Sequence, residues 1–183
     1  MMKKILILYS TKEGHTKSIA EKIASELKQE TELIRVTRKN QKINFLEYSF
    51  VILGASIHIG SYQKRFLKFV KKNIQELNYL QTAFFTVCLT VKEEGEQGKA
   101  EVKKYIDTFI DYTKLSTVHK SVFAGALLYK EYSFLKRLLM SSIAKKSGGD
   151  HDTAKNFIYT DWNDVKKFCI ACTTMIKNHQ TNN

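Results

Sequence analysis

The run ILILYSTKEGHTKSIA, residues 5–20, passes from an apolar segment through a polar loop that contains glycine into an amphipathic pattern. Residues 5–9 are apolar without interruption, which is typical of a strand that is buried on both faces. After the loop, apolar residues recur at the spacing of one helix face: Ile19, Ala20, Ile23, Ala24 and Leu27. The run therefore predicts a buried strand, a loop and a helix.

Segments of the same two kinds alternate along the rest of the chain. We expect further strands at residues 31–36, 50–54, 83–89, 121–126 and 156–160. Helices are expected over residues 66–77 and 97–112 and from about Asp161, which can cap the last helix. Such alternation predicts an α/β fold in which helices cover both faces of a parallel sheet. Residues 1–183 are expected to form a single domain.

The connection between the strands at 121–126 and 156–160 is long. It holds about thirty residues, where ~2 to 6 are usual, so we expect an insertion at about 127–156. Within it, residues 129–146 have helical periodicity, with one apolar stripe formed by Tyr132, Leu135, Leu139 and Ile143 and widened by Phe134 and Leu138. The same stretch carries one acid, Glu131, and five cations: Lys130, Lys136, Arg137, Lys145 and Lys146. A basic amphipathic helix of this kind lies on an anionic membrane or lines an acidic ligand site, and a helix that only covers the sheet edge would look the same.

The chain as a whole is basic. Thirty Lys and Arg against 18 Asp and Glu give a formal net charge of +12, which favours an anionic partner and leaves nucleic acid, anionic lipid and acidic substrates open. Three cysteines are too few for a disulfide framework and suit a reducing compartment, so we expect a cytoplasmic protein. The apolar run after Lys4 is too short for a signal peptide, and no stretch reaches the ~18 to 20 apolar residues of a membrane-spanning helix.

The loop between the first strand and the first helix is a candidate phosphate site. It would present free N–H groups at the positive end of a helix dipole, its hydroxyls add donors, and Gly14 allows close approach of the backbone. An ordinary capped helix start would show the same residue types. The candidate ligands are Ser10, Thr11, Lys12, Glu13, Gly14, His15 and Thr16.

Residues 7–20 resemble the flavodoxin signature over their whole length. The pattern continues beyond them and departs at Lys22, where it has an aliphatic residue. The chain contains neither G-x-x-x-x-G-K-[ST] nor G-x-G-x-x-G. The resemblance implies a doubly wound, five-stranded parallel sheet of order 2-1-3-4-5 with FMN at the switch point between the first and third strands. It also implies that the loop after the third strand carries the isoalloxazine ring and that the loop after the fourth closes the other side. The residues concerned are Ala55, Ser56, Ile57, His58, Gly60 and Tyr62 in the first of these loops and Cys88, Leu89 and Thr90 in the second.

Residues 146–153 and 159–162 resemble the menaquinone-dependent protoporphyrinogen IX oxidases, as do residues 54–57 and 125–127. That family interrupts the fifth strand of its flavodoxin fold where this chain has its insertion. The resemblance implies FMN-dependent oxidation of protoporphyrinogen IX to protoporphyrin IX in haem synthesis, with electrons passed to menaquinone. It implies a protein at the inner face of the cell membrane, whose insertion cations meet substrate propionates or anionic lipid, and no metal or nucleic acid. His58 is the side chain to test for a catalytic role.

Two other functions fit parts of the sequence. A flavodoxin-type electron carrier or an FMN-dependent quinone reductase would share the phosphate loop, although a simple carrier has no need of the basic insertion. A flavin-free module could use the basic face to bind RNA or acidic lipid. Cys169 and Cys172 have the spacing of a redox motif, but they fall inside a predicted helix, so we expect them to be structural.

Overall fold

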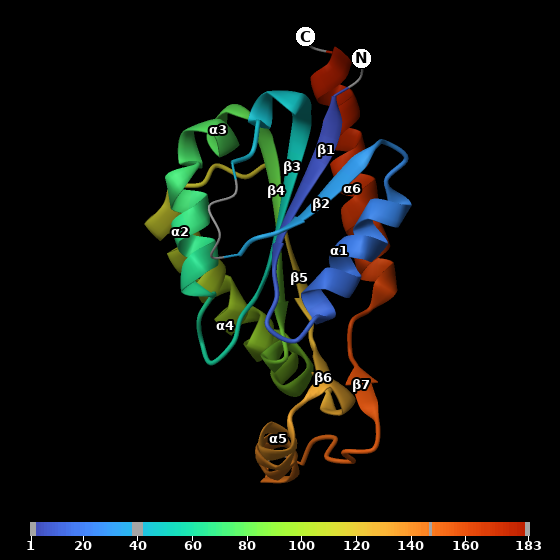
Figure 1. The fold of residues 1–183 in the computed structure, drawn as a ribbon. Helices are drawn as coiled ribbons and strands as arrows, with labels where there is room; N and C mark the ends of the chain where they lie inside the picture. The colour runs from blue at the N-terminus through green and yellow to red at the C-terminus, as the bar shows by residue number, and fades with distance from the viewer. Residues whose placement is uncertain (1–2, 38–41, 147, 182–183) are drawn as a thin grey trace.

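The computed structural model describes residues 3–37, 42–146 and 148–181, with side chains except those of residues 91–96, 99 and 179–181. Its centre is a five-stranded parallel sheet of order β2-β1-β3-β4-β5 (Figure 1). The strands are β1 (Lys4–Ser10), β2 (Thr31–Arg35), β3 (Tyr48–Ser56), β4 (Gln81–Cys88) and β5 (His119–Ala124). The predicted flavodoxin-like fold and strand order are confirmed.

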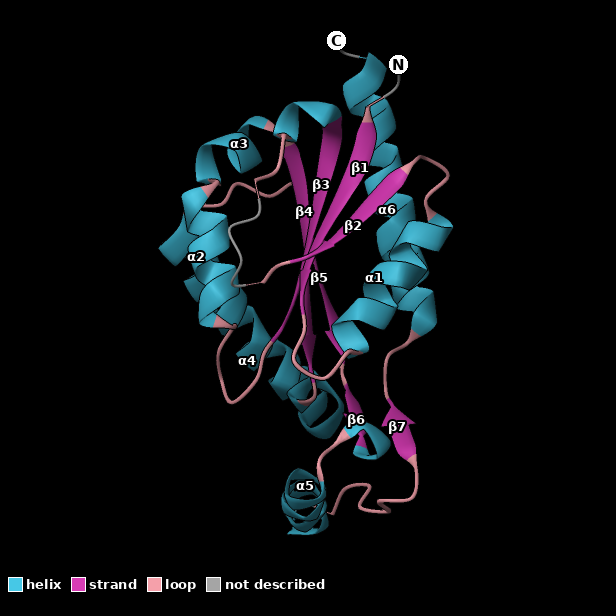
Figure 2. Ribbon diagram, in the orientation of Figure 1, coloured by secondary structure: helices cyan, strands magenta, loops and turns pink. Residues whose placement is uncertain are grey.

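Helices cover both faces of the sheet (Figure 2). One face carries α1 (His15–Glu26) and α6 (Trp162–Thr181), and the other carries α2 (Lys64–Lys72), α3 (Ile74–Tyr79) and α4 (Thr90–Thr113). A short 3₁₀ helix, η1 (Phe45–Glu47), precedes β3. Ile5 and Ile7 pack toward the first helix pair and Leu6 and Leu8 toward the other side. The uninterrupted apolar run of β1 follows from this burial on both faces.

Several helix boundaries differ from the prediction. The helix expected over 66–77 is divided at Asn73, whose side-chain amide donates to the Phe69 carbonyl at 2.7 Å and so ends α2. The helix expected from residue 97 begins at Thr90, directly after β4. The expected cap of the last helix is confirmed, because Asp161 Oδ1 accepts the Asn163 N–H at 2.8 Å.

The insertion leaves and rejoins the domain through a second, small sheet. The strand expected over 121–126 ends at Ala124, and after Gly125 the chain forms β6 (Ala126–Leu128), which pairs antiparallel with β7 (Asn156–Ile158). Between them lie η2 (Tyr129–Glu131) and α5 (Phe134–Lys146). Figure 1 shows this unit at the carboxyl ends of the strands, at the opposite end from both termini.

The single helix expected over residues 129–146 is interrupted. Tyr132 adopts an extended conformation between η2 and α5, and its side chain is buried in a small separate core with Leu127, Tyr129 and Ala144. Ala144 is the buried residue of α5. The rest of the predicted stripe is exposed: Phe134 71%, Leu135 78%, Leu138 53%, Leu139 60% and Ile143 51%. No helix in the described ranges is long and apolar enough to cross a membrane.

Candidate cofactor site

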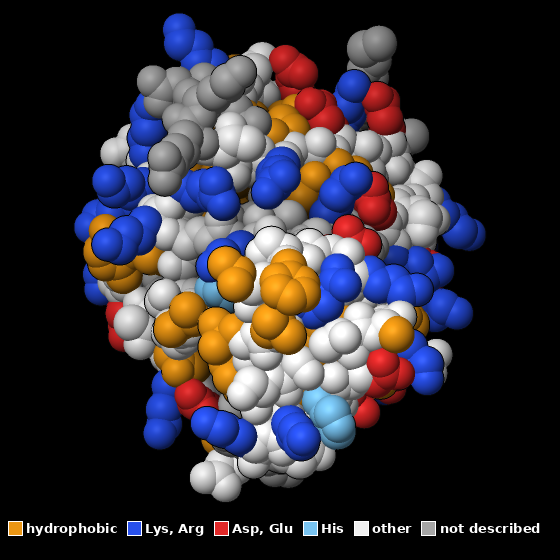
Figure 3. All heavy atoms as spheres, turned by 60° about the horizontal axis from the view of Figure 1, so that its bottom comes forward, with side chains coloured by type: hydrophobic (Ala, Val, Ile, Leu, Met, Phe, Trp, Pro, Cys, Tyr) orange, Lys and Arg blue, Asp and Glu red, His pale blue; other side chains and the backbone are white. Residues whose placement is uncertain are grey.

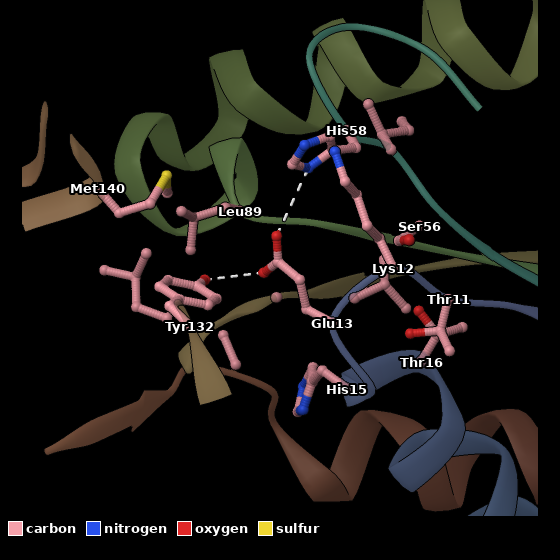
Figure 4. Close-up of a pocket in the computed structure, with 15 residues that line it drawn as sticks. Thr11, Lys12, Glu13, His15, Thr16, Ser56, His58, Leu89, Tyr132 and Met140 are labelled. Carbon is pink, nitrogen blue, oxygen red and sulfur yellow. Dashed lines mark hydrogen bonds and ion pairs between the residues drawn. The ribbon is translucent and has the colours of Figure 1, made fainter. Parts of the chain in front are cut away.

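A pocket lies at the carboxyl ends of the central strands, on the side where the insertion leaves the sheet (Figure 4). Its walls come from the loop before α1, the loop after β3, the end of β4 and the first part of the insertion. In a doubly wound sheet of this order, ligands bind at this edge, beside the switch point between β1 and β3. The lining residues are Thr11, Lys12, Glu13, His15, Thr16, Ser56, Ile57, His58, Val87, Leu89, Gly125, Ala126, Leu127, Tyr132 and Met140.

The loop before α1 is arranged to receive an anion. Gly14 is left-handed (φ 99°), a conformation that a side chain would strain, and its N–H donates to Thr11 Oγ1 at 2.9 Å. Because α1 begins at His15, the first N–H groups of the helix have no intrahelical carbonyl to bind. Ser10 Oγ is buried and has no hydrogen-bond partner within the described residues. Free donors at the positive end of a helix dipole suit a phosphate group.

His15 ties this loop to the chain after the insertion. Its Nε2 lies 2.6 Å from Thr160 Oγ1, and the Thr160 hydroxyl donates to the Ala124 carbonyl at 2.6 Å. Since that hydroxyl has one proton, it accepts from His15, which assigns the proton of the neutral ring to Nε2. Burial lowers the pKa of His15, which agrees with a neutral ring. His15 is therefore a structural link as well as part of the pocket wall.

Glu13 lies at the centre of the pocket, where side chains from three segments converge (Figure 4). Tyr132 Oη donates to Glu13 Oε2 at 2.8 Å, and Lys136 Nζ lies 2.5 Å from Oε1. Burial and the Glu13 carboxylate raise the pKa of Tyr132, which keeps its hydroxyl protonated as a donor. Lys136 Nζ also lies 4.0 Å from the centroid of the Tyr132 ring, within cation–π range.

His58 faces Glu13 from the loop after β3. Its Nδ1 is 3.7 Å from Glu13 Oε1, which is beyond hydrogen-bond distance. Burial lowers the pKa of His58, Lys12 and Lys136 lower it further, and Glu13 opposes them. His58 is therefore neutral near pH 7, and its proximity to Glu13 is not a charge pair at that pH. A neutral imidazole in this position can accept a proton from a bound group.

The loop after β3 makes a tight turn beside the pocket. His58 and Ser61 are paired through a His58 N–H to Ser61 carbonyl bond of 2.9 Å, and the turn residues Ile59 and Gly60 both have positive φ, 49° and 67°. Positive φ at both central positions is the pattern of a type I′ hairpin turn, unusual for a β-branched residue such as Ile59. The Ile57 N–H donates to the Val87 carbonyl at 2.9 Å, which fixes the start of the loop against β4.

Comparisons with known proteins agree with this geometry. The flavodoxin domain family model matches residues 6–154. The chain is 37% identical over 169 residues to a Leishmania major protein named protoporphyrinogen IX dehydrogenase [quinone], covering 90% of this chain and 72% of that protein. It is also 37% identical to the protein of the same name from Escherichia coli K12, covering 90% of this chain and 92% of that protein. The chain belongs to the protoporphyrinogen IX dehydrogenase family. The predicted family is confirmed.

A solved structure supports the fold of this family member independently. A flavoprotein in complex with FMN from Lactobacillus acidophilus superimposes with a TM-score of 0.52 at 20% identity. The match covers 66% of this chain and 93% of that one.

The residues predicted to hold the cofactor of this dehydrogenase-family chain divide into two groups. Those that line the pocket are Thr11, Lys12, Glu13, His15, Thr16, Ser56, Ile57, His58 and Leu89. The others, Ser10, Gly14, Ala55, Gly60, Tyr62, Cys88 and Thr90, lie outside its lining. Tyr62 is furthest from the expectation: its ring packs against Phe84 and Phe109, and its hydroxyl pairs with Thr86 in the core. Cys88 is buried, and its carbonyl accepts the Gly125 N–H at 3.0 Å.

The five cations of the insertion also divide. Lys136 is paired with Glu13, and Arg137 Nη2 donates to the Tyr132 carbonyl at 3.3 Å. Lys130, Lys145 and Lys146 are exposed, the last two in the final turn of α5. Two of the five cations therefore have partners within the protein, and whether the group meets substrate propionates or anionic lipid stays a prediction.

Sequence reasoning missed part of the pocket wall. Gly125, Ala126 and Leu127 follow β5, whose carboxyl end shares an edge with β1 and β3, so their position was available from the strand order. Tyr132 and Met140 reach the pocket because the insertion folds back over it, and helical periodicity carries no signal for that path. Cys169 and Cys172 are buried in the core beside α1, and burial raises the pKa of Cys169 to about 11 and of Cys172 to about 12, so neither is a reactive thiolate.

Proposed function

We propose that this protein is an FMN-dependent oxidoreductase that converts protoporphyrinogen IX to protoporphyrin IX and passes the electrons to menaquinone in the membrane. The proposal rests on one observation: the insertion forms one wall of a flavodoxin-type pocket. The two relatives described above are named for protoporphyrinogen IX and a quinone, and each is matched over 90% of this chain. FMN supplies the redox chemistry when bound, so the protein's task is to bind, orient and tune.

The loop before α1 fits the FMN phosphate. Thr11 and Thr16 would add hydroxyl donors and the free N–H groups of α1 backbone donors, while Lys12, whose ammonium lies beside His58 (Figure 4), would supply positive charge next to it. The Ser10 hydroxyl, which has no partner among the described residues, lies at the same end of β1. The flavin ring would then lie between residues 56–58 and Leu89, where His58 is a neutral base within the pocket wall. Flavin absorbance that acid releases as FMN from the purified protein would test this assignment, and a colourless protein that binds no added FMN would contradict it.

The substrate would enter beside the insertion, from the membrane side. The exposed apolar side chains of α5 form a patch that Figure 3 shows with Lys and Arg side chains around it. An exposed apolar patch bordered by cations suits an anionic bilayer, in which the apolar side chains enter the headgroup boundary and the cations meet lipid phosphates. A lipid quinone and a poorly soluble tetrapyrrole would both arrive from that side. We therefore propose peripheral association with the inner face of the cell membrane.

The exposed cations provide the test of this orientation. Changing Lys130, Lys145 and Lys146 to Gln leaves the contacts of Lys136 and Arg137 intact. Each cation near an anionic surface contributes about 1 kcal/mol, so the triple variant should bind acidic vesicles roughly a hundredfold more weakly. Changing Lys64, Lys68 and Lys72 on α2 to Gln removes the same charge from another part of the surface and serves as the control.

Two further results would show whether these cations also meet the substrate and whether the proposed orientation is wrong. A raised KM for protoporphyrinogen in detergent, where no charged bilayer remains, would show that the same cations also meet the substrate propionates. Vesicle binding at the wild-type level across low and moderate salt would contradict the proposed orientation, because exposed charges respond to ionic strength.

A further inference from the structure

The carboxylate of Glu13 has an unusual place. It belongs to the loop that would receive a phosphate, where a negative side chain opposes binding of another anion. Its side chain, 19% exposed, points away from Thr11 and Thr16 and toward the insertion (Figure 4). There it accepts the Tyr132 hydroxyl at 2.8 Å and pairs with Lys136 at 2.5 Å. Two side chains of the insertion thus bind the same residue of the loop before α1.

The insertion needs such a link because α5 buries little apolar surface. Ala144 is its buried residue, while Phe134, Leu135 and Leu139 are each at least 60% exposed. Several other polar contacts join parts of the inserted unit to one another: Tyr129 Oη donates to the Asp150 carbonyl, and Ser141 Oγ donates to the His151 carbonyl. These contacts shape the unit without fixing it against the phosphate loop. The bonds to Glu13 do connect the two.

We propose that Glu13 is a positioning residue that holds the start of the insertion, Tyr132 to Lys136, against the phosphate loop, and that this contact closes the pocket over bound FMN and slows its release. The proposal rests on the assignment of FMN to the pocket. Glu13 stands directly before Gly14 and α1, so a ligand that orders this loop also fixes the carboxylate to which the insertion binds. Cofactor retention and the position of the insertion are thereby coupled.

Charge alone predicts the opposite effect for one substitution. Glu13→Gln removes a negative charge from the phosphate loop, so electrostatics without the contact would make FMN bind more tightly. If Glu13 holds the insertion, the same change weakens the contact and FMN leaves faster. Lys136→Met lowers FMN retention under both accounts, so Glu13→Gln is the informative variant.

The experiment compares Glu13→Gln, Lys136→Met and the double variant with the wild-type holoprotein. FMN dissociation is followed by recovery of flavin fluorescence on dilution, and hydrogen exchange of backbone amides is followed in peptides from residues 127–146. We expect each single variant to release FMN at least fivefold faster and to exchange faster in these peptides. The double variant should release FMN and exchange no faster than the more affected single variant. Lys136→Arg, which keeps the ion pair, should release FMN and exchange amides at wild-type rates, and so should Lys145→Gln, which removes an exposed charge from the same helix that does not contact Glu13.

Two results would overturn the proposal. One is Glu13→Gln with release and exchange rates at or below those of wild type. The other is single effects that add fully in the double variant, since that would show that Glu13 and Lys136 act independently. A protein that never binds FMN would contradict the proposed function instead, and hydrogen exchange in the apoprotein would still test the contact.

Discussion

The Thr160 hydroxyl makes the connection between the phosphate loop and the chain after the insertion, and Thr160→Val removes it with little change in shape. In the native protein that hydroxyl accepts from His15 Nε2 and donates to the Ala124 carbonyl, both at 2.6 Å. Thr160 and His15 are each only 7% exposed, so water cannot replace the lost partner easily. Valine leaves a buried imidazole N–H without an acceptor.

The expected cost follows from these contacts. A buried donor left unpaired costs about 1–3 kcal/mol, and the lost bond to Ala124 adds about 1 kcal/mol. We therefore expect Thr160→Val to lower the free energy of unfolding by roughly 2–4 kcal/mol, a large part of the about 5–15 kcal/mol typical of a domain. Because His15 is the first residue of α1, at the proposed phosphate site, FMN affinity should fall as well.

The assay is urea unfolding of the apoprotein followed by circular dichroism. Thr160→Ser keeps the hydroxyl and removes one methyl group, which should cost about 1 kcal/mol. The two variants together separate the hydrogen bonds from packing. A loss of stability in Thr160→Val no larger than that in Thr160→Ser would refute the structural role assigned to this hydroxyl.

Three further predictions concern the same site. Thr16→Val should weaken FMN binding by about 1.5–3 kcal/mol, the value of a charge-assisted hydrogen bond, and an unchanged flavin-fluorescence titration would exclude Thr16 as a ligand. Replacing Glu131 to Ser147 with a short Gly-Ser link should leave a folded protein that still binds FMN, with faster release, but has lost most porphyrinogen oxidation; if activity survives, α5 only covers the domain structurally. Burial lowers the pKa of His15, so below about pH 6.5 the unfolded chain takes up a proton that the folded state does not, and stability should fall as the pH falls. His15→Gln should flatten that part of the stability profile relative to wild type, and an identical slope in both proteins would speak against a neutral, buried His15.

The fold was predictable because its signals are local and repeated. The buried run of β1, the glycine-containing loop and the helix after it can be read directly, and alternation supplies the rest. Boundaries were less accurate where side-chain contacts decide them. Asn73 divides a helix by bonding to Phe69, and Gly125 separates β5 from β6 where the chain turns out of the central sheet.

The candidate site was predictable only where it follows from the order of the strands. Residues 11–13, 15–16 and 56–58 line the pocket because they follow β1 and β3, which meet at one edge. Tyr62 looked equivalent in sequence, but the turn at Ile59 and Gly60 sends it back into the core. Tyr132 looked like one more apolar position of a helix, and its role depends on a contact with Glu13, 119 residues away in the chain.

The most direct test of the proposed function is an anaerobic assay of the purified holoprotein with protoporphyrinogen IX and a menaquinone analogue, followed by porphyrin fluorescence. We predict that protoporphyrin IX accumulates only when both the holoprotein and the quinone are present, and that quinone reduction accompanies it. A holoprotein that carries FMN and reduces the quinone with another electron donor, yet forms no porphyrin above the enzyme-free rate, would contradict the assignment of the substrate.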